Sequence, residues 1–152
     1  MVKDFQTSDD ILQFAIEREE ESVDLYVDLS KTARNPEMKN VFLSFAGEER
    51  AHKKRLENIR TSRQFKFTPK EIQDIKIGDY LVDIVPHAGM SYQEILIVAM
   101  KKEKAAFHLY TNLAQKVTDQ LLQSLFFSLS QEESRHKLRF ELEYDEVVLK
   151  DN

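Results

Sequence analysis

The same arrangement of acidic residues and a histidine occurs twice in this chain. A single glutamate is followed thirty residues later by the motif Glu-x-x-His, and the two copies are Glu19 with Glu49 and His52, and Glu103 with Glu133 and His136. Each member of the second copy lies 84 residues after its counterpart in the first. Four carboxylates and two imidazoles in two equal halves match the ligands that a pair of bridged metal ions requires. The repeat therefore predicts a duplicated structure around a dinuclear metal site.

The repeat extends beyond these six residues. At the same offset fifteen positions are identical without a gap, and their first-copy members are Ile11, Leu12, Ala15, Glu19, Leu25, Tyr26, Leu29, Phe42, Ser44, Glu48, Glu49, His52, Lys53, Arg55 and Glu57. A duplicated αα-hairpin accounts for this pattern. We therefore expect two halves related by a pseudo-two-fold axis, with the metal site on that axis.

The composition favours long helices. Only three Gly and three Pro occur among 152 residues, of which 32% are charged and 41% are hydrophobic. Such a scarcity of turn-forming residues argues against a strand-rich fold. The length fits one domain, to which we assign residues 1–152. The net charge is −5, and without a long basic run we expect no nucleic-acid partner.

The sequence contains no cysteine, so disulfides, zinc–thiolate sites and iron–sulfur clusters are excluded. The first ten residues lack the apolar core of a signal peptide. No apolar stretch approaches the ~20 residues that a membrane-spanning helix needs. We therefore expect a soluble, cytoplasmic protein that has no membrane partner.

Apolar residues recur every three or four positions in four segments, which predicts helices at about 8–32, 36–62, 91–117 and 119–148. Each segment follows a capping signal, and the clearest are Asn35 before Pro36 and the Ser91–Glu94 capping box. Thr7 to Asp10 and Thr118 with Asp119 offer caps for the other two helices.

Residues 63–90 between the second and third helices lack a sustained helical period. Thr68 to Glu71 predicts the start of one short helix there, and Asp79 to Val85 is an apolar run that we interpret as extended. Short links produce antiparallel hairpins, whereas a link of this length must cross the bundle. The predicted fold is therefore all-α, an antiparallel four-helix bundle of two duplicated hairpins with one long crossover, as in ferritin-like proteins.

All six repeated acidic and histidine residues lie on the apolar faces of the expected helices. A glutamate on a core face carries a desolvation cost of about several kcal/mol when it is unpaired, and no Lys or Arg on these faces offsets it. Residues three apart share a helical face, so Glu49 and His52 can bind neighbouring points in space. We expect Glu19 and Glu103 to bridge the two ions. Oxygen and imidazole ligands suit iron, with manganese as a substitute.

Several neighbouring residues repeat as well. Tyr26 and Tyr110 lie seven positions after the single glutamates, which favours a hydrogen bond to a ligand carboxylate over a purely apolar role. Glu48 and Glu132 repeat and are candidates for supporting contacts with the ligands. We expect the remaining nearby residues to be solvated or outside the site: Glu17, Glu20, Glu21, His87 and His108.

The six-residue pattern, the ungapped repeat and the crossover together resemble the ferritin-like di-iron carboxylate superfamily, and within it a stand-alone rubrerythrin-like domain. The resemblance covers about residues 8–148. It implies a cytoplasmic oxidoreductase of oxidative-stress defence that reduces hydrogen peroxide or dioxygen, with an external electron donor and a homodimeric state. It also implies two iron ions, with manganese or mixed occupancy as alternatives, bound by Glu19, Glu49, His52, Glu103, Glu133 and His136.

This chain departs from peroxidase-type rubrerythrins in two respects. They carry an additional glutamate three residues after the third-helix ligand, where this chain has Ala106. They also usually carry a rubredoxin domain with four cysteines, which this chain lacks.

The departures leave other functions open. A ferroxidase or iron-storage protein is the main alternative, although the sixteen residues after His136 leave little for the fifth helix of a storage cage. An oxygenase would need an organic-substrate cavity beside the metals, of which the sequence shows no sign. A purely structural bundle would bind no metal.

Overall fold

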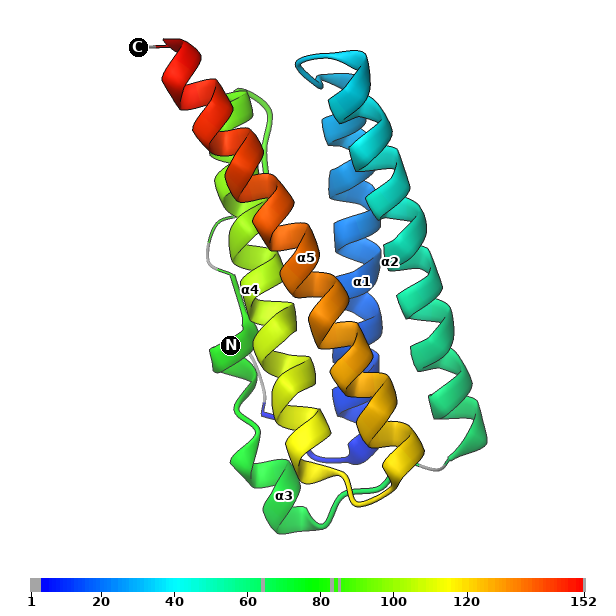
Figure 1. Ribbon diagram of the computed structural model, residues 1–152. Coiled ribbons are helices and arrows are strands. Elements are labelled where there is room, and N and C mark those ends of the chain that lie inside the picture. Colours follow the sequence, from blue (N-terminus) through cyan, green and yellow to red (C-terminus); the bar gives the residue numbers. More distant parts are fainter. Residues whose placement is uncertain (1–3, 64, 83, 85, 152) are drawn as a thin grey trace.

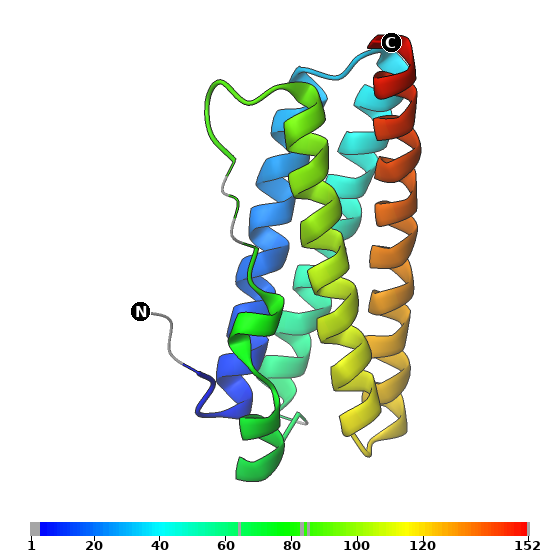
Figure 2. The ribbon, with the colours of Figure 1, turned by 90° about the vertical axis from the view of Figure 1, so that its left-hand side faces the viewer.

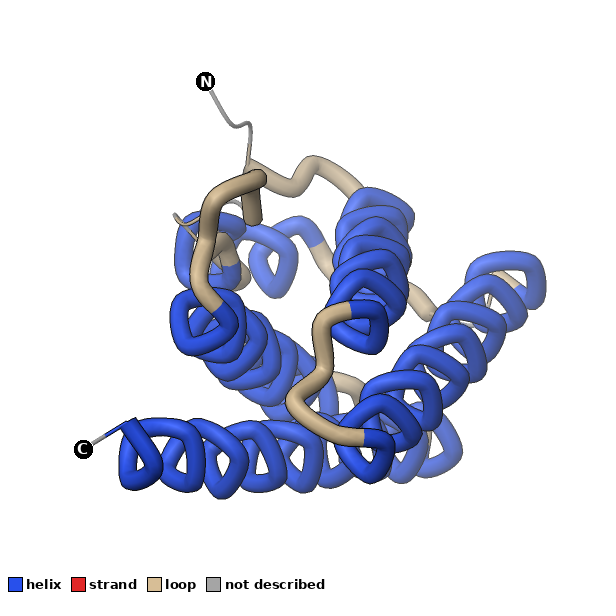
Figure 3. Tube along the Cα trace, turned by 90° about the horizontal axis from the view of Figure 1, so that it is seen from above, coloured by secondary structure: helices blue, strands red, loops and turns tan. Residues whose placement is uncertain are grey.

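Four long helices form the structure: α1 (Ser8–Lys31), α2 (Pro36–Ser62), α4 (Tyr92–Lys116) and α5 (Gln120–Asp151). The computed structural model describes residues 4–63, 65–82, 84 and 86–151. Helix α1 packs mainly against α2, and α4 packs mainly against α5, so the bundle consists of two helical hairpins placed side by side (Figure 1). The view along the bundle shows all four helices around a common interior (Figure 3). The predicted all-α, ferritin-like fold class is confirmed.

Local side-chain hydrogen bonds fix where the helices begin. Thr7 and Ser91 each form a capping box with the acidic residue three positions later, at the starts of α1 and α4. Asn35 caps α2 by accepting a hydrogen bond from the third backbone amide that follows it. Asp119 accepts two backbone N–H bonds at the start of α5. These bonds satisfy amides that have no partner within the first helical turn.

The crossover between α2 and α4 contains a short helix, α3 (Pro69–Asp74), and a 3₁₀ turn, η1 (Ile77–Tyr80). Helix α3 begins at Thr68 through the predicted capping signal. The crossover runs along the bundle beside α1 and α4 (Figure 2).

The extended conformation predicted for Asp79 to Val85 was wrong for its first two residues, which belong to η1. Residues 81, 82 and 84 have no regular secondary structure, and Asp83 and Val85 lie outside the described residues. The segment is apolar because it covers the bundle: Tyr80 is buried, and Leu81 and Ile84 pack against the core.

The core consists of two apolar clusters, one towards each end of the bundle. The first includes Phe126 and Tyr110, and the second includes Phe42 and Tyr26. These residues occupy equivalent positions of the repeat, so each half of the sequence supplies one tyrosine and one phenylalanine to the same relative place. Each fully buried large side chain contributes roughly 1.5–3 kcal/mol to stability. The two clusters hold the middle layer of the bundle in place from both sides.

The outer surface of α5 exposes several large apolar side chains, among them Phe127, Leu138 and Leu142. Within the described part of the chain, none of the helices combines the length and apolar character that crossing a membrane requires.

An ion pair with a buried carboxylate connects the α1–α2 turn to the other hairpin. Glu143 on α5 is 1% exposed and accepts hydrogen bonds from Arg34 at 2.7 and 3.0 Å. The hydroxyl of Tyr92 on α4 donates a third, at 2.8 Å. Because a buried carboxylate needs such partners, this contact fixes the two hairpins relative to each other at that end.

We predict that Arg34→Ala lowers the free energy of unfolding by about 1–3 kcal/mol, because it leaves the buried Glu143 carboxylate with one donor. Chemical denaturation measures the change. Lys31→Ala is the control, since its ion pair with Asp28 is largely exposed and exposed pairs contribute little. Equal effects of the two substitutions would contradict the proposed role of Glu143.

Candidate metal centre

The six residues predicted to bind metal meet in the middle layer of the bundle, between the two apolar clusters. They form two groups whose candidate ligand atoms lie within 4.8 Å of one another, namely Glu19, Glu49, His52 and Glu133, and Glu49, Glu103, Glu133 and His136. All six side chains are buried. Each group draws on three of the four long helices, so the site exists only when the two hairpins are together.

Glu49 and Glu133 belong to both groups, whereas Glu19 and Glu103 each belong to one. The expectation that Glu19 and Glu103 bridge two ions does not agree with this geometry. The residues common to both groups are instead the glutamates of the two Glu-x-x-His motifs. The reason is the placement of the helices: the α2 and α5 glutamates lie between the two histidines, and the single glutamates lie at the outer ends.

Both histidines direct Nδ1 towards the carboxylates. His52 Nδ1 lies 2.8 Å from Glu133 Oε1, and His136 Nδ1 lies 3.0 Å from Glu49 Oε1. The two rings are nearly parallel, with 13° between their planes and 6.3 Å between their centroids. In addition, Phe45 stacks on His136 with 4.0 Å between ring centroids. Each imidazole is therefore held with one nitrogen facing the interior of the site.

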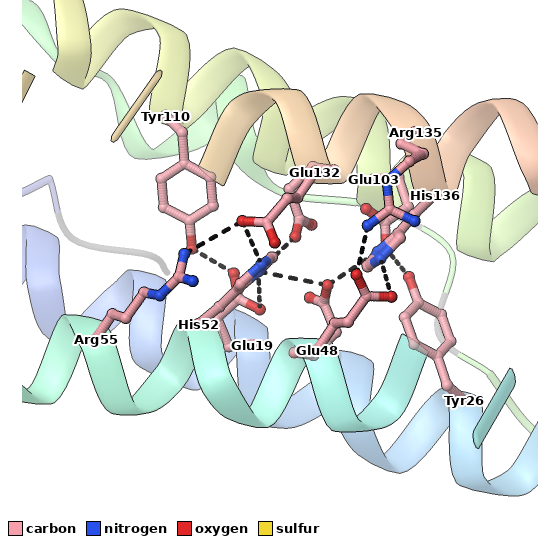
Figure 4. A network of polar contacts seen from close by, with 12 residues as sticks. Glu19, Tyr26, Glu48, His52, Arg55, Glu103, Tyr110, Glu132, Arg135 and His136 are labelled. Atoms are coloured by element: carbon pink, nitrogen blue, oxygen red, sulfur yellow. Dashed lines mark hydrogen bonds and ion pairs between the residues drawn. The ribbon is translucent and has the colours of Figure 1, made fainter. Parts of the chain in front are cut away.

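The outer nitrogens of the histidines meet glutamates from the opposite hairpin (Figure 4). His52 Nε2 lies 3.2 Å from Glu132 Oε2, and His136 Nε2 is hydrogen-bonded to Glu48 at 3.2 Å. The candidate supporting glutamates therefore do contact the histidines. A carboxylate at Nε2 favours the tautomer that carries its proton there, which leaves the Nδ1 lone pair free to bind metal.

An arginine accompanies each of these outer glutamates. Arg55 Nη1 donates to Glu132 at 3.2 Å, and Arg135 donates to Glu48. Partial burial raises the pKa of Glu48, but its contacts with Arg135 and His136 together more than offset this, and the pKa is lowered overall. Glu48 is therefore ionised when it contacts the histidine.

The two repeated tyrosines hold the single glutamates from across the bundle. Tyr110 on α4 donates to Glu19 on α1, and Tyr26 on α1 donates to Glu103 on α4 (Figure 4). The hydrogen bonds predicted for these tyrosines are present. One oxygen of each single glutamate is thereby held by a phenol, and the second oxygen remains available to the site.

Eight buried atoms of the site have no hydrogen-bond partner of their own. They are Glu19 Oε2, both carboxylate oxygens of Glu49, Glu103 Oε2, Glu133 Oε1, both ring nitrogens of His52 and the Nδ1 atom of His136. Among the described residues, no Lys or Arg forms an ion pair with any of the six side chains. Buried polar atoms are nearly always satisfied. Two cations placed among these donors would satisfy them, so the residues fit a dinuclear metal site.

In the metal-free protein, the crowding of carboxylates changes their acidity. Burial, followed by the negative charge of Glu133, raises the pKa of Glu19, Glu49 and Glu103. Burial would raise the pKa of Glu133 as well, but its contacts with His52, Glu103 and Glu49 together lower the value to about 2. The group therefore keeps protons at carboxylates where a bound cation would replace them.

The two histidines respond in opposite directions. Burial lowers the pKa of His136. Burial also lowers that of His52, but Glu133 and Glu19 more than offset this and raise the pKa of His52 to about 10. Metal binding must therefore displace a proton from His52, while His136 already presents a neutral imidazole.

The residues expected to lie outside the site do so. His87 and His108 are exposed, the first in the crossover and the second on the outer face of α4. Glu20 and Glu21 are exposed on α1.

A cavity of about 460 Å³ adjoins the site on the side of α1, α4 and the crossover. Three site glutamates contribute to its wall: Glu19, Glu49 and Glu133. This cavity could not be predicted from the sequence, because its wall combines side chains from segments far apart in the chain.

Two helical hairpins that enclose two joined carboxylate–histidine groups define a ferritin-like protein with a dinuclear metal site. The sequence model of one such family, rubrerythrin, matches residues 10–144. The chain therefore belongs to the rubrerythrin family, which confirms the resemblance noted in the sequence. Searches of curated proteins and of solved structures gave no significant match. With no cysteine in the sequence, the four-cysteine site of a rubredoxin domain is absent.

We predict that Glu48→Gln and Glu132→Gln each weaken metal binding about 10–100-fold, because each removes the carboxylate that orients a histidine. Competition with a chromophoric chelator measures the affinity. Glu20→Gln is the matched control, since Glu20 is exposed and, within the described part of the chain, its ion pair is with Lys53. An equal loss in Glu20→Gln would show that overall charge, and not histidine orientation, sets the affinity.

We also predict that the difference in melting temperature between metal-loaded and metal-free protein widens from about pH 5 to about pH 8. Glutamates whose pKa is raised above 4.5 destabilise the metal-free fold as pH rises beyond that value. The raised pKa of His52 acts in the same direction, because the stability it confers is complete below 6.5 and is lost towards 10. Glu133, with its pKa of about 2, is ionised throughout this window. Thermal unfolding across the pH series checks the prediction, and a constant difference would contradict it.

Proposed function

We propose that this protein is a non-haem di-iron oxidoreductase that reduces hydrogen peroxide or dioxygen in defence against oxidative stress. The observation that carries the proposal is the pair of joined groups in which Glu49 and Glu133 are shared. Shared carboxylates place two cations close enough to act on one small oxidant together. Membership of the rubrerythrin family supports the same class of reaction.

Iron is the metal that we propose, with manganese or mixed occupancy as alternatives. The donor set consists of carboxylate oxygens and imidazole nitrogens, which suits these ions. Four carboxylates balance the charge of two divalent cations, so the loaded site adds no net charge to the core. When bound as two ferrous ions, iron supplies the two electrons that reduce one peroxide molecule to water.

The side chains around the centre hold the candidate ligands in position. Glu132 and Glu48 fix the orientation of His52 and His136 through their outer nitrogens. Tyr110 and Tyr26 fix the single glutamates, and burial raises the pKa of Tyr110 well above 10. Tyr110 therefore stays protonated at neutral pH and donates its hydroxyl hydrogen to Glu19 in a hydrogen bond.

Access to the centre differs between its two sides. On the α2–α5 side, the outer glutamates and their arginines cover the histidines (Figure 4). On the α1–α4 side, the cavity reaches Glu19, Glu49 and Glu133. We propose that the oxidant enters through this cavity.

A ferroxidase or iron-storage function is the alternative that a specific observation favours. Ala106 and Ser22, three residues after the two single glutamates, occupy equivalent positions in the two halves. Neither supplies a seventh carboxylate, so the residues form a symmetric six-ligand set. Iron uptake beyond two ions per chain would identify this alternative.

We also propose that electrons come from a separate donor, because the chain has no cysteine for a rubredoxin-type centre. A homodimer in the cytoplasm is our further proposal, supported by family resemblance. Light scattering of the purified protein measures the oligomeric state directly.

The test of the proposed function is stopped-flow oxidation of the protein loaded with about two ferrous ions per chain. We expect faster oxidation by hydrogen peroxide than by dioxygen, because peroxide accepts the two available electrons in one complete step. A strong preference for dioxygen, with continued iron uptake, would favour ferroxidase activity. Failure to bind two metal ions would refute both functions.

Substitution of Ala106 by glutamate tests how the missing carboxylate affects selectivity. Ala106→Glu should raise the ratio of peroxide to dioxygen reaction rates, whereas Ala51→Glu on the exposed face of α2 should leave that ratio unchanged.

A further inference from the structure

The cavity beside the metal centre is much larger than a peroxide or dioxygen molecule requires. Its volume is about 460 Å³, whereas one water molecule occupies about 30 Å³ in the liquid. Sites that hold organic ligands in proteins are typically about 300–1,000 Å³. The cavity therefore has the size of an organic-ligand site.

Small side chains create the space at its inner end. Ser22 on α1 and Ala105 and Ala106 on α4 contribute to the wall close to the site glutamates. Leu81 and Val82 of the crossover contribute on the opposite side. The crossover exists in only one copy, so it breaks the pseudo-two-fold symmetry on the α1–α4 side. A pocket between α2 and α5 also exists, but none of the six candidate ligands lines it.

The wall is predominantly apolar, and its members include Phe14, Leu25, Leu81, Ile84 and Leu109. Such a lining suits a molecule that loses little hydration on entry.

The wall also carries six carboxylates and two cations. Arg18 Nε lies 3.1 Å from Glu21, and Lys102 Nζ lies 2.9 Å from the same carboxylate. The Arg18 guanidinium also lies over the Phe14 ring, 4.5 Å from its centroid. Three of the other carboxylates are candidate metal ligands, whose charge bound cations would neutralise, and Asp28 pairs with Lys31. Because both wall cations already have an anionic partner, the wall does not favour an anionic ligand, and its apolar members favour a neutral one.

We propose that this cavity binds a neutral, mainly apolar organic molecule whose inner end lies against Glu19, Glu49 and Glu133. Binding of such a molecule goes beyond the reduction of peroxide or dioxygen and does not depend on which metal is bound. It gives the centre a second kind of ligand, placed next to the metal-binding carboxylates.

The first experiment is a fluorescence titration of the metal-free protein with N-phenyl-1-naphthylamine, a neutral aromatic probe that brightens in apolar surroundings. We expect saturable binding that Ala106→Phe weakens by at least about tenfold, equivalent to about 1.4 kcal/mol. Ala105→Phe, at a half-buried position of the same wall, provides a second test if the first variant does not fold. Ala51→Phe, on the exposed face of α2, is the matched control and should bind as the unmodified protein does.

Circular dichroism confirms that each variant is folded before titration. Absence of saturable binding to the unmodified protein would overturn the proposal. Equal affinity in the folded cavity variants and the control would overturn it as well, because the probe would then bind elsewhere.

A second experiment locates the probe relative to the metal centre. It uses fluorine NMR of 4-fluorobiphenyl, a neutral aromatic compound similar in shape to the fluorescent probe. Spectra are recorded with one protein sample loaded with Mn²⁺ and another loaded with Zn²⁺. We expect strong broadening by paramagnetic Mn²⁺ alone, since the cavity wall includes three of the candidate ligands. Binding without this broadening, in protein shown to hold Mn²⁺, would overturn the proposed location. Failure to hold either metal would instead refute the proposed function and leave the fluorescence result standing.

Discussion

The burial of four carboxylates in one layer of the bundle is the constraint on which the rest of the structure depends. Ionised glutamates in an apolar interior are strongly destabilising unless protons, cations or hydrogen bonds neutralise them. Here the two apolar clusters keep the layer closed, while Tyr110 and Tyr26 satisfy one oxygen of each single glutamate. The remaining orphan atoms converge on two points between the hairpins. The chain thus uses the stability of its apolar ends to maintain a middle layer that is unfavourable without metal.

Much of this arrangement could be predicted from the sequence because the repeat encodes it twice. Helical periodicity placed the six residues on inward faces, and Asn35 and Ser91 marked helix starts that the structure retains. The sharing of Glu49 and Glu133 could not be predicted, because all four glutamates face inward and only helix packing determines which lie between the histidines. The arginines that pair with Glu132 and Glu48 could not be predicted either, because Arg55 and Arg135 do not occupy equivalent positions of the repeat. The run from Asp79 misled the interpretation, because an apolar segment that covers a bundle resembles a strand in sequence.

The two sides of the metal centre differ in structure. Its six candidate ligands are nearly symmetric, but the residues that surround them are not. The α2–α5 side is closed by Glu132 and Glu48, which contact the outer nitrogens of the histidines and pair with arginines. The α1–α4 side is covered by the crossover, which the repeat does not include, and holds the cavity. Selectivity for small or large molecules can therefore change through the crossover and through positions such as Ser22 and Ala106, while the ligands themselves stay the same. The opposite pKa shifts of His52 and His136 show that the two halves also differ in how they hold protons.

Almost every supporting contact at the centre joins one hairpin to the other. Tyr110 serves Glu19, Tyr26 serves Glu103, Glu132 contacts His52 and Glu48 contacts His136. Neither hairpin contains a complete site, and each completes the other in the same way. Two identical hairpins from separate chains would place the ligands, the tyrosines and the outer glutamates in the same reciprocal way, since all of these residues repeat. In a single chain, this reciprocity limits how far the two halves can diverge. A substitution at a ligand in one half removes the partner of a tyrosine or glutamate in the other half, so the two halves are constrained to change together.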